Sequence, residues 1–342
     1  MLEGAIRSAD GVRREMWRIA VKTRLGRACV TDRAARLSTL AIGHIIVALV
    51  LTAVAPLWLL LLGPLILGVP HIIGDVRFLL IRPPPGVVRS LGIALVVPLG
   101  GLVAVRVATV LGYGWWPAVE VALGSAAILI GAFMARGRWR VLAMVIAVAI
   151  SGVAMAHPRL AAITLAHLHN LVAFGLWLWL AFKERRAALY AVVGGAYLLA
   201  AAVIFSGALD MSAFHSGHPG LTIDLMVQTL APGLSPTLGV RLVLFYAFAQ
   251  AIHYVVWIRL MPGTLPWSPR PSTPTISKAL SELTSDLTRP GMLFAVVSIV
   301  AILGFSLVDA AGTRAAYLSL VLFHGWLELA VLTNLIANRR AA

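Results

Sequence analysis

The sequence predicts an all-α, polytopic integral membrane protein: a bundle of about ten transmembrane helices with both termini on the cytoplasmic side. Three observations predict this fold. Of the 342 residues, 60% are hydrophobic and only 12% are charged, and the mean hydropathy is +0.93. A soluble domain carries about twice that share of charged residues. The apolar residues also fall into runs of roughly 20, the length of helix that crosses the hydrocarbon core.

Each predicted span is an apolar run bounded by charged residues or by Pro and Gly. The ten spans are 38–55, 57–81, 88–112, 118–135, 140–156, 159–182, 187–207, 239–260, 291–309 and 315–337.

The basic residues predict the orientation of these spans. Of the 28 Lys and Arg residues, all but four fall on connections of one side; the exceptions are Arg106, Arg159, Arg241 and Arg314. Basic loops stay in the cytoplasm, so we predict a multi-pass protein of the cell's inner (cytoplasmic) membrane. Below, "inner" denotes this predicted cytoplasmic side and "outer" the opposite side.

The chain divides into a basic cytoplasmic segment, residues 1–36, and a single transmembrane domain, residues 37–342. Met16 and Trp17 in the first segment suit an amphipathic helix at the lipid headgroups. Two connections are long: an outer loop near 208–238, which holds His215 and His218, and an inner loop near 261–290 with the spacing of an interfacial helix. A loop of that length is a candidate lid.

Charge and cysteine content exclude other classes of protein. The net charge of +15 comes from short basic clusters between apolar runs, without a recognition fold, so we expect no nucleic-acid partner. The bilayer is the expected partner, and protein partners are not predicted. Cys29 is the single cysteine, which excludes an intrachain disulfide or a thiolate metal site.

Ionisable residues inside the spans carry most of the functional information, because burying them in a bilayer costs several kcal/mol. Five predicted spans contain histidine, at His44, His71, His167 with His169, His253 and His324. At about 1.5 Å per residue, His44, His71, His169, His253 and His324 lie between roughly 9 and 22 Å from the inner boundary. One buried site can contain that range of depths.

The stretch GVPHIIGDVRFLL, residues 68–80, repeats a device found again near the C-terminus. His71 and Asp75, like His324 and Glu328, are four residues apart and share a helix face. Such a carboxylate can accept the second imidazole N–H of a metal-bound histidine, or be a ligand itself. Pro70, with Gly68 two residues earlier, should break the helical hydrogen-bond ladder locally.

Simpler roles compete with a metal site. A single intramembrane histidine more often ties two helices together. If Asp75 has only a structural role, we expect it to pair with Arg77 or Arg82. His253 can equally mark the inner boundary beside Trp257. His167 and His169 are about 200° apart on a helix and should not face one metal together. The number of helices with buried histidine favours the metal site.

At GVPHIIGD the sequence resembles the Brp/Blh family of membrane β-carotene cleavage oxygenases, whose members carry a similar Pro-His-x-x-x-Asp motif. The preceding isolated histidine, His44, adds to the resemblance, whereas the family's later pair of histidines four residues apart has no counterpart. The resemblance implies a non-haem iron that activates O2, with His44 and His71 as ligands.

We therefore predict a histidine-ligated metalloenzyme, an O2-dependent oxygenase with iron (Fe2+) acting on a lipid-soluble, carotenoid-like substrate; copper and zinc are alternatives. Expected metal ligands are His44, His71, His253 and one of His169 or His324. Asp75 and Glu328 support the metal as catalytic residues, and Tyr254 positions O2 or substrate.

Two other functions stay open. A haem b electron carrier would use His169 and His324 as axial ligands. A proton- or ion-coupled transporter would use His71, Asp75, His324 and Glu328 as a relay.

Overall fold

The computed structural model describes residues 2–182, 186–215, 220–264 and 276–338, and these residues form helices without a strand. The predicted all-α membrane bundle is confirmed. Within the described chain, eight helical segments are long and apolar enough to cross a membrane. They are α3 (Arg33–Val54), α4 (Pro56–Asp75) with the π-helical η1 (Val76–Ile81), α5 (Leu91–Val110), α8 (Pro158–Ala181), α9 (Ala187–Phe205), α12 (Pro236–Val255) with the π-helical η2 (Val256–Leu260) and α13 (Met261–Thr264), α14 (Ile276–Ser306), and α15 (Ala310–Leu320) with α16 (Phe323–Ala337).

Two further apolar helices lie where spans were predicted. These are α6 (Pro117–Phe133) and α7 (Arg140–Ala156), of 17 residues each, a little short for an untilted crossing. The total of ten spans and their orientation therefore stay predictions. The last predicted span is divided in two, because a turn at Val321 and Leu322 separates α15 from α16 just before His324.

Proline begins four of these helices at their predicted outer ends. Pro56, Pro117, Pro158 and Pro236 are the first residues of α4, α6, α8 and α12. Proline suits this position because its fixed φ is helical and the N–H it lacks would have no partner there. These prolines also mark the boundaries that hydropathy alone leaves uncertain.

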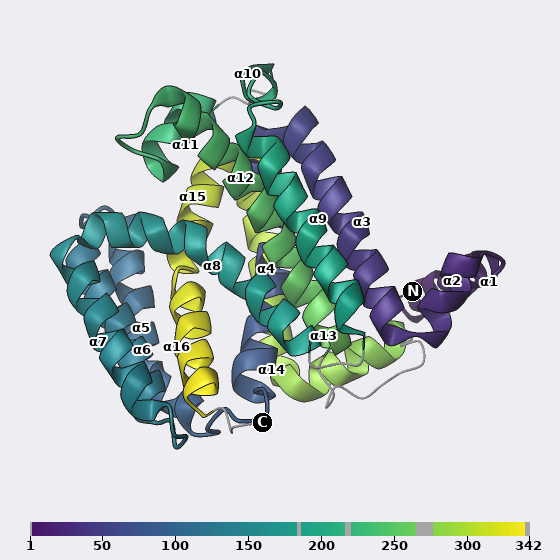
Figure 1. Cartoon of the computed structure of the whole chain (residues 1–342), viewed down its shortest axis with the longest axis horizontal. Helices are drawn as coiled ribbons and strands as arrows, with labels where there is room; N and C mark the ends of the chain where they lie inside the picture. Colours follow the sequence, from purple (N-terminus) through teal and green to yellow (C-terminus); the bar gives the residue numbers. More distant parts are fainter. Residues whose placement is uncertain (1, 183–185, 216–219, 265–275, 339–342) are drawn as a thin grey trace.

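Four helices form the centre of the bundle: α4 packs against α12, α12 against α8, α8 against α16, and α16 against α4. In Figure 1, α5, α6 and α7 lie on one side of this centre and α3 and α9 on the other, while α8 crosses it obliquely. The predicted site residues other than His44 come from these four central helices and from none of the peripheral ones.

A glycine contact fixes α16 against α6. A β-carbon on Gly131 of α6 would collide with the carbonyl oxygen of Ala330 on α16, so only glycine permits this approach. Close backbone approach through small residues is the usual way in which membrane helices pack. It places the face of α16 that carries His324 and Glu328 towards the centre.

The helix α4 continues through Pro64 and Pro70, so the local break in the hydrogen-bond ladder predicted at Pro70 lies inside a continuous helix. Pro64 lacks an N–H and leaves the carbonyl of Leu60 without its helical donor. The buried Arg314 side chain of α15 supplies a donor instead, with Nε 2.6 Å from that oxygen. The helical pattern changes only after Asp75, where η1 begins.

Segments outside the central bundle lie at its two ends. The N-terminal helices are α1 (Leu2–Ala20) and α2 (Arg24–Thr31), and the outer segment contains α10 (Ser212–His215) and α11 (Ile223–Leu230). The predicted interfacial helix is the first part of α14, residues 276–287, which a non-helical backbone at Thr288 (φ 63°) separates from the span that follows.

Asp286 of this first part accepts hydrogen bonds from Arg77 and Arg82 of the η1 region. Both arginines that were considered as partners of Asp75 are therefore engaged elsewhere. Asp75 itself is fully buried, and neither of its carboxylate oxygens has a hydrogen-bond partner among the described residues. The expectation that Asp75 pairs with Arg77 or Arg82 is wrong.

Candidate metal centre

Four histidine rings, one from each central helix, meet inside the bundle: His71 of α4, His253 of α12, His169 of α8 and His324 of α16. Neighbouring ring centroids are 5.3 Å apart for His71 and His253 and 5.0 Å for His253 and His169. The circuit closes at 5.2 Å from His169 to His324 and 5.0 Å from His324 to His71. The order of the four imidazole rings is the order in which α4, α12, α8 and α16 pack against one another.

This spacing suits one metal ion between the rings. A metal–nitrogen bond of about 2.1 Å places neighbouring imidazole centroids roughly 5 Å apart around an ion. The ligand nitrogens of His71, His253 and His324 already lie within 4.8 Å of one another, and all three residues are buried. These residues could therefore hold a metal ion after small adjustments of their side chains.

Backbone carbonyls fix the tautomer of three of the rings. His169 Nδ1 lies 3.0 Å from Leu165 O and His324 Nδ1 approaches Val321 O, while His71 Nδ1 is 3.4 Å from Leu67 O. A carbonyl can only accept, so each Nδ1 carries the hydrogen and Nε2 is left with a lone pair. In the described structure the Nε2 atoms of His71 and His324 are buried without any hydrogen-bond partner.

Two buried carboxylates join this group of histidines. Ligand atoms of Asp75, His324 and Glu328 lie within 4.8 Å of one another, and both acids are fully buried. The sequence left two roles open for these acids: accepting the second N–H of His71 and His324, or being ligands themselves. The backbone carbonyls have the first role instead, so the carboxylates lie towards the ligand nitrogens and are themselves candidate ligands.

Asp75 and Glu328 are the groups through which this centre could attract a cation. Removing a carboxylate from water costs several kcal/mol unless a positive charge compensates. Both oxygens of Asp75 and Oε2 of Glu328 have no hydrogen-bond partner among the described residues. One divalent ion would balance the two carboxylates, with neutral imidazoles completing its coordination.

Trp257 of η2 holds Glu328 in place. Its indole Nε1 donates to Glu328 Oε1 over 2.7 Å, and the same oxygen is 3.8 Å from His253 Nε2. Trp257 follows His253 by one helical turn and shares its face. The sequence had suggested a membrane-boundary tryptophan here; the spacing from His253 is the signal that would have placed it in the site.

Tyr254 also reaches the centre, but beside a different histidine from its sequence neighbour. Its ring lies 4.6 Å from that of His71 and 5.9 Å from that of His253. Tyr254 is fully packed in the bundle, with only 2% of its surface exposed. Tyr254 therefore lies against one histidine of the candidate site.

Other histidines lie elsewhere. His44 is half-buried on α3, with Nδ1 2.7 Å from Leu40 O, and it makes no ring contact with the four histidines in the described structure. His167 Nε2 lies 2.8 Å from Leu230 O, so it faces away from His169 as its spacing predicted. His218 and the side chain of His215 lie outside the described residues.

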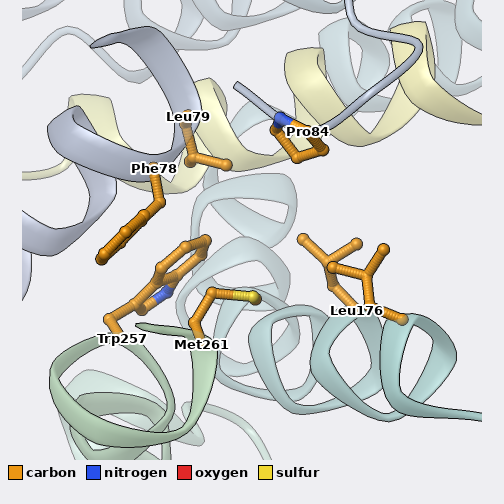
Figure 2. A pocket seen from close by; sticks show the side chains of 7 residues that line it. Phe78, Leu79, Pro84, Leu176, Trp257 and Met261 are labelled. Carbon is orange, nitrogen blue, oxygen red and sulfur yellow. The ribbon is translucent and has the colours of Figure 1, made fainter. Parts of the chain in front are cut away.

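Figure 2 shows a small apolar cleft beside Trp257. Its side chains leave no room for a water molecule, so a ligand could enter only after they move. Both π-helical segments contribute to its wall, and so does Trp257, whose indole N–H is bonded to Glu328. The lining residues are Phe78, Leu79, Pro84, Leu176, Leu180, Trp257 and Met261.

Comparison with known proteins gives no relative for this chain: no family model, no curated protein and no solved structure matches it.

Proposed function

We propose that this protein is an integral-membrane metalloenzyme whose non-haem iron, held by His71, His169, His253 and His324, oxidises a lipid-soluble substrate with O2. The observation that carries the proposal is the closed circuit of four imidazole rings with centroids 5.0–5.3 Å apart. Imidazole-rich sites suit iron, copper and zinc, and iron is the one among them that commonly serves oxygenases.

The residues of the site have separate roles in this proposal. The histidines bind the metal through Nε2, while the carbonyls of Leu67, Leu165 and Val321 orient three of the rings. Asp75 and Glu328 balance its charge or complete its coordination. Bound iron would supply the activation of O2, and the protein excludes water, because every one of these side chains is buried or half-buried.

The surroundings support an apolar substrate. The cleft beside Trp257 is lined by seven apolar side chains, and it lies within the predicted membrane-spanning segments. A hydrocarbon chain that partitions into the bilayer suits this lining better than a water-soluble metabolite. π-Helical turns are frequent at functional sites, and both η1 and η2 adjoin this cleft.

The resemblance of GVPHIIGD to the Brp/Blh oxygenases supports iron and a carotenoid-like substrate within this proposal. His71 retains in it the role that the resemblance implies. His44, the other ligand implied by the resemblance, is replaced by His169 and His324, which lie in the circuit of rings.

The spacing of the rings argues against the haem alternative. A haem between His169 and His324 would need a flat macrocycle between two axial rings, but their centroids are only 5.2 Å apart. His71 and His253 also fill the space around that axis, at 5.0 Å from one or other of the two rings.

The experiment is elemental analysis with a visible absorption spectrum on detergent-purified wild type, His71→Ala and His324→Ala. We expect near-stoichiometric iron and no Soret band in the wild type, and loss of more than about nine-tenths of the metal in each variant. His157→Ala is the matched control, because His157 is exposed at the outer end of α7.

Each other outcome contradicts the proposal in a defined way. A Soret band would assign a haem protein. A metal-free, colourless wild type would make the buried carboxylates and histidines a proton or ion relay. Full metal occupancy in both site variants would place the metal elsewhere. If iron is found, oxygen uptake with carotenoids and other lipids identifies the substrate.

A further inference from the structure

Arg314 is a buried cation on the outer side of the candidate metal centre. It lies one turn after the first residue of α15, and only 7% of its surface is exposed. In the described structure its guanidinium forms no ion pair with a carboxylate. A buried charge without a counter-charge is costly, and a bound anion would remove that cost.

The guanidinium of Arg314 is hydrogen-bonded through Nε alone within the described structure. Its Nε donates to the carbonyl of Leu60, which Pro64 leaves free, over 2.6 Å. Within the described residues no hydrogen bond is found for its two Nη groups. The planar fork of arginine matches a carboxylate in geometry, so a fixed Nε leaves donors in a defined direction for such a ligand.

Two tyrosine rings lie against α4, the helix that Arg314 also contacts. Tyr317 is one turn from Arg314 on α15, and its hydroxyl is buried without a hydrogen-bond partner among the described residues. Its ring lies against Gly68 of α4, where a β-carbon would collide with it. The ring of Tyr254 lies against Gly63 of the same helix, three residues after Leu60, whose carbonyl accepts the hydrogen bond from Arg314. An unpartnered buried hydroxyl is a second, independent sign of a missing ligand.

The contacts of these groups are spaced along α4 from Leu60 to His71. Along α4, Leu60 contacts Arg314, Gly68 contacts Tyr317, and His71 contacts Tyr254 with ring centroids 4.6 Å apart. Arg314 itself lies only about 6 Å below the outer end of α15, a depth at which lipid headgroups meet acyl chains. A ligand with its anionic end there can direct its apolar part towards His71.

We propose that Arg314, Tyr254 and Tyr317 bind the carboxylate of a long-chain, lipid-soluble acid on the outer side of the four-histidine centre. The assignment of this acid as the substrate rests on the proposed function. The binding of the acid does not, because none of the three residues is a candidate metal ligand.

The test is a binding measurement on the full chain in phosphatidylcholine nanodiscs, with hexadecanoate, hexadecanol and acetate as probes. We expect hexadecanoate to bind at least about 10-fold more tightly than hexadecanol, and Arg314→Gln to lose that difference, as removal of a charged hydrogen bond implies. Equal affinity for acid and alcohol, or unchanged affinity in Arg314→Gln, would overturn the proposal. Competition by acetate as effective as by hexadecanoate would overturn the lipid assignment in favour of a small soluble anion.

Two further variants separate binding from a structural role. Arg241→Gln is the matched control, since Arg241 is another outer arginine but pairs with Asp210, and it should bind hexadecanoate normally. In Pro64→Ala/Arg314→Gln the new N–H satisfies the Leu60 carbonyl, so a merely structural role is compensated. Continued loss of hexadecanoate binding in a folded double variant supports the proposal, and recovered binding contradicts it.

Metal analysis of the same samples distinguishes this inference from the proposed function. Arg314→Gln should keep the metal of the wild type while it loses the acid. A metal-free wild type that still prefers hexadecanoate would contradict the metalloenzyme and leave the acid site supported.

Discussion

Trp257 donates its indole N–H to Glu328 over 2.7 Å and thereby fixes this carboxylate 3.8 Å from Nε2 of His253. The contact joins η2 to α16 across the centre of the bundle. It gives a fully buried carboxylate its only hydrogen bond within the described structure.

Trp257→Phe should weaken metal binding by about 10-fold, because the ring is kept but the donor that orients Glu328 is lost. The measurement is metal retention against a graded series of chelator concentrations. Trp116→Phe, at an exposed position, is the control. Equal retention in the wild type and Trp257→Phe would show that Glu328 does not act on the metal.

His44→Ala should keep its full metal content, in contrast with the sequence-based prediction of a ligand. The ring of His44 is half-buried on α3 and bonds to Leu40 O of its own helix. Elemental analysis beside His253→Ala decides the point. Loss of metal from His44→Ala in a folded protein would return His44 to the ligand set.

Leu176→Trp should fill the cleft beside Trp257 and abolish oxygen uptake with the lipid substrate while the metal content stays unchanged. The space between the lining side chains does not admit even a water molecule, so an indole in place of Leu176 leaves no room for a substrate to pass. Leu168→Trp, on an exposed part of the same helix, serves as the control. Normal uptake by Leu176→Trp would exclude this cleft as the path of the substrate.

Gly131→Leu should lower the temperature of unfolding in detergent by several degrees, because α6 and α16 can no longer approach. Overpacking of this kind costs about 1–3 kcal/mol. Gly100→Leu adds the same side chain where nothing lies within 4 Å, so it should unfold like the wild type. Similar unfolding of the two variants would contradict the close packing of α16.

Much of the fold follows from the sequence because the length of a membrane helix is set by the bilayer. Apolar runs and the prolines at helix starts locate most of the helices within a few residues. The turn between α15 and α16 was not predicted, because residues 310–337 are apolar enough for one continuous span.

The site was predicted in part. Polar residues inside apolar runs identified His71, His169, His253 and His324, because burying an ionisable residue in a bilayer is costly and usually serves a function. Depth alone could not separate them from His44. In a helix that is apolar all round, the sequence does not show which face meets the centre, and so the contacts of Trp257 and Arg314 depend on packing that periodicity does not reveal.

The two arginines that follow Asp75 in the sequence bind a carboxylate outside the candidate metal centre. Arg77 and Arg82 are bonded to Asp286 on the first part of α14, which crosses the inner end of the bundle in Figure 1. Through η1 these arginine contacts reach α4, the helix that carries His71 and Asp75. The side chains of Arg77 and Arg82 keep 16% and 30% of their surface exposed. Because anionic phospholipids and salt compete for exposed arginines, we expect the lipid composition of one leaflet and the choice of detergent to affect the buried centre.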